Sequence, residues 1–304
     1  MELPSHLKSL YSHLLKHTIK PTKDLSFNFD NDLYKSIITF SNERMRIYEN
    51  KSQGLKPPYT YNPILKEFRF CNIYRELDKQ TIDFHTLLKP YVNDLPHWLL
   101  NMLLCRFICK PETIEEIGLL SFDEKNNAKV YEKLLSLPSP KYGSAYIFPI
   151  SLIQKSNHNT REKFFCFYLP EIVHKVSDVI RMFKDVSVIN ALEKILPIFK
   201  YNFKFHWTEV LIDIAYQYPD YIDLFKRFPI GPGSLPTMKR LNSSKHPEDV
   251  CLDLVSTVPS NFEYLTYNGI PLYLSAENWE GIGCEYRKYT NLKEGKGRKR
   301  KYIV

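Results

Sequence analysis

The stretch HWTEVLIDIAYQYPDYIDLF, residues 206–225, predicts a helix that lies inside the protein. Apolar side chains occupy positions 210–212 and 214–215, on both sides of Asp213, and a helix that is apolar all round is buried all round. Glu209 lies one turn before Asp213 on the same face, where like charges repel. Burying two carboxylates together raises the pKa of at least one of them unless cations or hydrogen bonds meet them.

This pair of carboxylates has two interpretations. In the functional one, Glu209 and Asp213 supply acid–base or electrostatic catalysis on a base or a sugar. In the structural one, Glu209 caps the helix or faces solvent, and Asp213 pairs with an arginine.

Helical periodicity continues through most of the chain, and strand signals are weak, with EKFFCFYLP (162–170) the best candidate for a strand. We therefore predict a mostly α protein, either one compact domain or two helical lobes with a cleft. Besides the helix at 206–217, we expect helices near residues 5–19, 30–50, 68–81, 83–90, 96–109, 110–121, 123–137, 170–184, 187–199, 219–227, 246–259 and 277–290, and a short one within 228–242.

The stretch IGPGSLPTMKRL (230–241) has the residues of a phosphate-binding turn. Its glycines, Gly231 and Gly233, allow close approach of the backbone, and Ser234 can cap a short helix that carries Lys239 and Arg240. A tight turn between packed helices explains the glycines equally well.

The stretch FRFCNIYRELDKQT (68–81) predicts a helix whose apolar face, Phe70, Ile73 and Leu77, is buried. Its polar residues are Asn72, Arg75, Glu76, Asp78 and Lys79. From spacing alone they form surface ion pairs worth a few tenths of a kcal/mol each, or they belong to a site.

Composition and charge narrow the classes of function. Hydrophobic residues make up 43% and charged residues 25%, as in an ordinary soluble protein. The formal charge of +8 indicates a polyanionic partner. Part of the excess lies in the tail KEGKGRKRKYIV (293–304), which either follows phosphates or is a solvated end. Glycine is scarce and neither G-x-G-x-x-G nor a P-loop occurs, so we expect no nucleotide cofactor.

Several other patterns are missing from the sequence. The six cysteines form no C-x-x-C pair, which favours reduced thiols, and no H-E-x-x-H helix is present, so we expect no metal site. No signal peptide and no apolar run of membrane-spanning length are found, and we therefore expect a cytoplasmic protein without membrane contact.

Four stretches, taken in order, resemble the alpha-glutamyl/putrescinyl thymine pyrophosphorylase family, whose members act on modified DNA bases. Residues 44–81 are similar to its arginine-containing segment, Pro-rich loop and F-x-N-x-Y-R-E-x-D motif. YGSAYIFP (142–149) is similar to its aromatic A-Y segment, and residues 207–241 to its E-V-x-x-D helix and G-P-G turn. CEYRKYTNLKEGKGRKRKY (284–302) is similar to its closing C-E-[FY]-x-K-Y segment and basic tail.

The resemblance implies a helix-hairpin-helix DNA glycosylase-like fold at residues 41–292, between an N-terminal helical extension (1–40) and the basic tail (293–304). It also implies double-stranded DNA with hypermodified pyrimidines as the partner. One departure is that FKYNFKFHW (199–207) has no glycine where such glycosylases have a glycine-rich hairpin, so that the turn at 230–233 would have to hold the phosphates.

The resemblance also assigns roles to residues. Asp213, Glu209 and Asp78 would be the catalytic carboxylates, with Asp213 preferred. The pocket for the base and its modification would contain Asn72, Tyr74, Arg75, Glu76 and Tyr146. Phosphates would be held by Gly231, Gly233, Ser234, Lys239, Arg240 and Lys288.

Three functions follow from the resemblance. The first is a glycosylase that excises a bulky modified pyrimidine, such as glucosylated hydroxymethylcytosine or modified hydroxymethyluracil, from phage DNA in anti-phage defence. The second is a phage transferase that replaces the pyrophosphate of activated 5-hydroxymethyluracil by an amino acid or a polyamine. The third is a DNA-binding module without catalysis. Both reactions require the target base to leave the stack.

Overall fold

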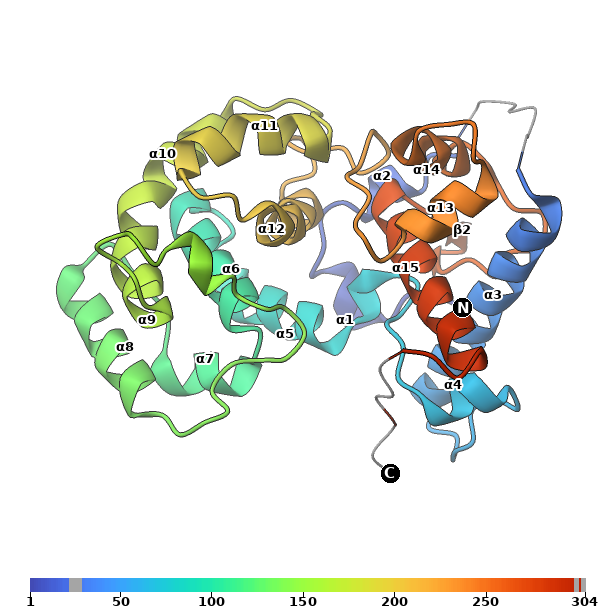
Figure 1. Cartoon of the computed structure of the whole chain (residues 1–304), viewed down its shortest axis with the longest axis horizontal. Helices are drawn as coiled ribbons and strands as arrows, with labels where there is room; N and C mark the ends of the chain where they lie inside the picture. The colour runs from blue at the N-terminus through green and yellow to red at the C-terminus, as the bar shows by residue number, and fades with distance from the viewer. Residues whose placement is uncertain (22–28, 298–300, 302–304) are drawn as a thin grey trace. The chain divides into compact units, whose positions relative to one another are not determined.

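The structure is a computed structural model that describes residues 1–21, 29–297 and 301. The helices and strands of Figure 1 have the following bounds: α1 Ser5–Lys8, α2 Leu14–His17, α3 Asn31–Ser52, α4 Pro63–Glu67, η1 Arg75–Leu77, α5 Lys79–Leu88, η2 Lys89–Tyr91, α6 Leu95–Ile108, α7 Pro111–Ile117, α8 Glu124–Ser136, η3 Ile150–Leu152, α9 Arg161–Lys163, η4 Phe164–Tyr168, α10 Leu169–Arg181, α11 Val188–Phe199, α12 Lys204–Gln217, α13 Leu235–Leu241, α14 Pro247–Val255, β1 Thr266–Tyr267, β2 Ile270–Pro271 and α15 Ala276–Lys293. The prediction of a mostly α fold is confirmed.

The chain forms two compact units. Unit 1 comprises Met1–Ser9, Leu14–Asp78 and Leu224–Val304, and unit 2 comprises Leu10–His13 and Lys79–Asp223. In the described part of the chain, no helix is both long and apolar enough to cross a membrane.

Unit 1 is organised by α15, which packs against α3, α4, α13 and α14 (Figure 1). A capping box starts this helix: the Ser275 hydroxyl accepts from the backbone N–H of Asn278, whose side chain accepts from the N–H of Ser275. The side chain of Asp30 caps α3 in a similar way by accepting from the N–H of Leu33. Two long helices with fixed N-termini therefore form the frame of unit 1.

Unit 2 is organised by α6, which packs against α5, α10 and α12 and is buried along its whole length. Aromatic rings fill its core, and Phe107 on α6 contacts Phe148, Phe165 and Phe203 at centroid distances of 5.3, 5.5 and 5.2 Å. Burial of such rings is a large source of stability. The helix α12 is buried as predicted, and Asp213 has no exposed surface.

Four predicted elements differ in the structure. The single helix predicted at 5–19 is two short helices, α1 and α2, with non-helical residues 9–13 between them. Residues 68–74 are extended and only Arg75–Leu77 turn as a short 3₁₀ helix, so the predicted helix at 68–81 is wrong. The predicted strand at 162–170 is helical, because the Thr160 side chain caps α9 and the aromatic run continues through η4 into α10. Residues 219–227 form turns instead of a helix.

Candidate functional site

In unit 1 the first and last motifs of the sequence come together. The backbone N–H of Cys71 donates to Oε2 of Glu285 at 3.0 Å, and Nζ of Lys288 lies 3.4 Å from the same oxygen. The Lys288 ammonium also lies 4.6 Å from the centroid of the Phe70 ring and donates to the carbonyl of Arg69. The helix α15 therefore holds the extended segment 69–71 through one carboxylate and one cation.

Arg44, a buried residue of α3, fixes the same segment from another direction. One guanidinium nitrogen donates to the carbonyls of Phe70 and Cys71, at 3.1 and 3.2 Å. Its guanidinium carbon lies 5.8 Å from the Phe70 ring, which adds a cation–π contact. In the sequence Arg44 is one residue of a motif without an assigned role. Its hydrogen bonds to the carbonyls of Phe70 and Cys71 show that it holds this segment.

Asp78 is the half-buried carboxylate at the end of this segment. Its Oδ1 accepts from the backbone N–H and the side-chain amide of Asn72, at 3.2 and 2.9 Å, and the same amide donates to the carbonyl of Leu77. Burial raises the pKa of Asp78 to about 6, against the lowering effects of the Asn72 hydrogen bond and the Arg75 charge. Both of these hydrogen bonds from Asn72 fall on Oδ1, and within the described residues no hydrogen bond to Oδ2 is found.

We call Arg44, Asn72, Asp78, Glu285 and Lys288 the Asp78 cluster. Glu285 raises the pKa of Asp78, and Arg44 lowers it, so these charges act on one another electrostatically. A carboxylate with a pKa near neutrality, held through one oxygen and close to the charges of Arg75 and Arg44, has the properties of a general base.

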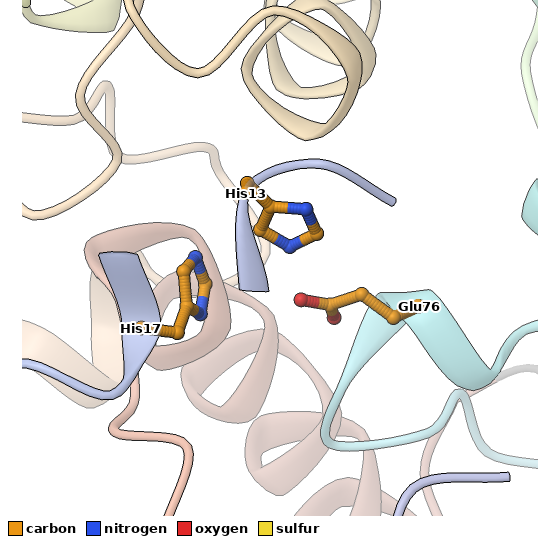
Figure 2. Close-up of side chains that lie close together, drawn as sticks. All are labelled: His13, His17 and Glu76. Atoms are coloured by element: carbon orange, nitrogen blue, oxygen red, sulfur yellow. The ribbon is translucent and has the colours of Figure 1, made fainter. Parts of the chain in front are cut away.

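The other residues of the first motif lie in the interior of the protein. Tyr74 is fully buried and its hydroxyl donates to the carbonyl of Leu272 at 2.7 Å, an arrangement that anchors the segment in the core of unit 1. Arg75 and Glu76 are buried as well. Figure 2 shows the Glu76 carboxylate turned toward the His17 ring, and their ligand-forming atoms lie within 4.8 Å of one another.

His17 and Glu76 both belong to unit 1, whereas His13, drawn in the same view, belongs to unit 2. In the sequence His13 and His17 have the H-x-x-x-H spacing, a metal-ligand signal that the expectation of no metal site passed over. Two ligands from one unit are fewer than the three or four that protein zinc sites supply.

The G-P-G turn packs against α15. The N–H of Gly231 and the hydroxyl of Ser234 donate to Oε1 of Glu280, at 3.1 and 2.7 Å. A Cβ on Gly233 would lie 2.4 Å from Sγ of Cys284, so only glycine allows this approach. These contacts are those of a turn between packed helices. Lys239 and Arg240 are exposed on α13.

Two of the carboxylates predicted from sequence lie on α12 in unit 2. Asp213 accepts from Nε and a terminal nitrogen of Arg106, at 2.6 Å each, and Nε2 of His85 lies 3.2 Å from Oδ1. All three side chains are buried, and the Arg106 guanidinium also lies 5.3 Å from the Phe84 ring. This is a buried bidentate ion pair, the structural interpretation of Asp213.

Glu209, one turn before Asp213, has a different environment. It is half-buried and accepts a hydrogen bond of 2.5 Å from the hydroxyl of Tyr146. The structure therefore brings together two residues that the sequence assigned to a site, one from α12 and one from the segment before η3. They belong to unit 2, whereas the Asp78 cluster belongs to unit 1.

The helices and the Asp78 cluster define a helical domain with a carboxylate site. A family model described as "5-hmdU DNA kinase, helical domain" matches residues 31–298, and the chain belongs to this family. The family links the chain to enzymes that modify hydroxymethyluracil-type DNA, which is the coarser part of what the motifs predicted; the pyrophosphorylase family that they resemble is not the family that matches. No curated protein and no solved structure matches the chain.

Proposed function

We propose that this protein is an enzyme that excises a hypermodified pyrimidine from DNA, with Asp78 as its general base. The observation that carries the proposal is the state of Asp78: Asn72 holds Oδ1, and burial raises the pKa to about 6. A base with a pKa near the working pH combines a large ionised fraction with good proton affinity.

The reaction needs one water and one flipped nucleotide. Oδ2 of Asp78 takes a proton from the water, whose oxygen forms a bond to C1′ of the sugar. The bond between C1′ and the ring nitrogen breaks, its electron pair leaves with the base, and the base is protonated by solvent. The products are an abasic site and the free modified base.

The cationic residues near Asp78 have separate roles in this proposal. Lys288 stabilises a phosphate or the charge that develops on the leaving base, because its ammonium lies beside the segment that precedes Asp78. The buried Arg44 holds the carbonyls of that segment. Arg75 lowers the pKa of Asp78 and so keeps part of it ionised. The class of base, a substituted hydroxymethyluracil or a glucosylated hydroxymethylcytosine, and a role in anti-phage defence belong to the same proposal.

The residues of α12 take different roles. Asp213 serves stability in this account, since Arg106 binds both of its oxygens. Glu209, with Tyr146 as its hydrogen-bond donor, belongs to unit 2 and has no assigned step in this reaction.

A second candidate is transfer to the exocyclic methylene of an activated 5-hydroxymethyluracil, with loss of pyrophosphate. Lys288 favours it, because its ammonium can hold a departing anion, and the description of the matched family refers to chemistry on the same base. Asp78 would then take the proton of the incoming amine.

The test incubates the protein with DNA that contains hydroxymethyluracil, its pyrophosphorylated form or glucosylated hydroxymethylcytosine, and with plain DNA. Abasic sites and a released base, detected by mass spectrometry, support excision. A heavier nucleoside that appears only with added amine contradicts excision and supports transfer. DNA binding without any product contradicts both and leaves a binding module.

A further inference from the structure

A second site in unit 1 is a groove of about 520 Å³ lined by α3, α15 and the residue that caps α4. This volume is in the range of small-ligand pockets. The two helices lie side by side in Figure 1, and α15 carries Lys293 on one wall while α3 carries Lys35 on the other. None of the residues so far assigned to the Asp78 cluster lines this groove.

The charge of the groove is positive. Lys35 and Lys293 are exposed, and within the described part of the chain neither forms an ion pair. The single acid in the lining, Glu43, accepts from the hydroxyl of Thr60 and lies 4.0 Å from Arg46, whose closer partner is Glu263. Two exposed ammonium groups against one carboxylate leave the lining with a net positive charge, which favours an anionic ligand.

The aromatic wall of the groove is formed by Tyr289, Tyr286 and Phe40. Tyr289 is half-buried, and its hydroxyl accepts from the side-chain amide of Asn62 at 3.0 Å, which fixes the orientation of the ring. Its ring centroid lies 5.2 Å from that of Phe40. A fixed aromatic ring between cations is the arrangement with which proteins hold a nucleobase and its phosphates.

The side chain of Phe70 packs between the groove lining and the Asp78 cluster. The ring of Phe70 lies 5.9 Å from Phe40 and 6.4 Å from Tyr289 on the groove side, and the Lys288 ammonium of the cluster lies over it. On α15, Tyr286 and Tyr289 line the groove, whereas Glu285 and Lys288 contact the segment 69–71.

We propose that this groove binds one nucleotide unit of a DNA strand, with the base on the Tyr289 ring and the phosphates beside Lys35 and Lys293. The inference rests on the proposed function, since it takes DNA as the partner and places this nucleotide next to the one that reaches Asp78. Binding of this nucleotide does not depend on whether its base is modified, because an aromatic ring stacks on any base.

The experiment measures binding of a fluorescent, unmodified single-stranded oligonucleotide by anisotropy over a series of salt concentrations. The double variant Lys35→Gln/Lys293→Gln should lower the magnitude of the slope of log K against log salt by about 1.4, because each phosphate that a lysine no longer neutralises changes the slope by about 0.7. The variant Tyr289→Leu should weaken binding about tenfold, as expected for removal of one base stack. Circular dichroism confirms that each variant is folded.

The matched control is Lys51→Gln/Lys129→Gln. Both control lysines are exposed, and Lys51 lies on α3 at about 24 Å from Lys35, given 1.5 Å per residue. The control should leave the slope within about 0.3 of the parent's. Equal slopes for the groove and control variants, together with parental affinity of Tyr289→Leu, overturn the proposal.

Binding of free thymidine monophosphate and ATP is measured in the same way, to test whether the groove binds a free mononucleotide instead of a nucleotide within a DNA strand. If the groove substitutions abolish mononucleotide binding and leave oligonucleotide binding unchanged, the strand proposal is overturned. The assay uses unmodified DNA and needs no turnover. A protein that forms no product but shows the expected slope change contradicts the proposed function alone.

Discussion

The substitution Arg106→Met tests whether the pair of Arg106 and Asp213 stabilises unit 2. Arg106 donates two hydrogen bonds of 2.6 Å to Asp213, and neither side chain is measurably exposed. Methionine leaves the carboxylate buried without its main cation, and breaking a buried ion pair in this way costs about 3–5 kcal/mol. In a unit of this size, 1 kcal/mol corresponds to about 2–4 °C in Tm, so Tm should fall by about 6–20 °C.

Denaturation in urea, followed by tryptophan fluorescence, measures this decrease in stability. Trp98 and Trp207 are buried in unit 2 and Trp279 in unit 1, so the background Trp279→Phe restricts the signal to unit 2. The control is Arg181→Met, which breaks an exposed i, i+3 pair with Asp178 on α10. Such pairs contribute at most about 1 kcal/mol.

The double variant Arg106→Met/Asp213→Leu removes both charges and should recover most of the stability, because a buried pair replaced by apolar residues is often neutral. Two results would contradict a stabilising role of this ion pair. One is a decrease below about 1 kcal/mol in the single variant, and the other is an equal decrease in the single and double variants.

Three further predictions concern unit 1. Because burial raises the pKa of Asp78 to about 6, product formation should be constant above about pH 7 and fall about tenfold per pH unit below pH 6, as the base becomes protonated; a pH–rate profile without this limb contradicts the role of Asp78. Gly233→Ala places Cβ 2.4 Å from Sγ of Cys284 and should cost about 1–3 kcal/mol in urea denaturation; the added substitution Cys284→Ala should recover part of it, and equal stability of both variants rules out the clash. Tyr74→Phe removes the hydrogen bond to the carbonyl of Leu272 and should cost about 1–3 kcal/mol, whereas an unchanged midpoint of denaturation would show that this bond does not anchor the segment.

The buried helix α12 shows what local pattern predicts well. Apolar residues on every side of Asp213 were sufficient to predict burial, and the alternative of an arginine partner was stated from burial cost alone. The identity of that arginine was beyond the sequence, since Arg106 lies 107 positions earlier on another helix. The cost of burying the Asp213 carboxylate predicts a cationic partner, and the tertiary structure determines that this partner is Arg106.

The segment 68–78 shows where periodicity fails. Its apolar residues have helical spacing, but Asn72 uses its side chain to bind the carbonyl of Leu77 and the carboxylate of Asp78. Local bonds of this kind compete with a helix. The carbonyls of Phe70 and Cys71 bind Arg44, and the N–H of Cys71 binds Glu285, 214 positions away, so partners distant in sequence decide the conformation.

In the candidate site, too, the motif residues could be predicted from the sequence, whereas their contacts with distant residues could not. Asn72, Asp78 and Lys288 could be selected from motif residues, and the structure brings them into one unit with Glu285. The turn at 231–234 could not be interpreted from glycine alone, because the same residues fit a phosphate site and a close helix contact. Glu280 as the acceptor of its N–H and hydroxyl favours the helix contact.

In the proposed reaction, Asp78 is the general base in excision of a modified pyrimidine. The most direct measurement compares the rate of base release from modified DNA by the parent protein, Asp78→Asn and the control Asp83→Asn, whose carboxylate pairs with Lys79 at the surface. We predict that Asp78→Asn lowers the rate about 10²–10⁴-fold at unchanged DNA affinity, and that the control keeps the parental rate. Base release by Asp78→Asn at the parental rate would contradict the claim.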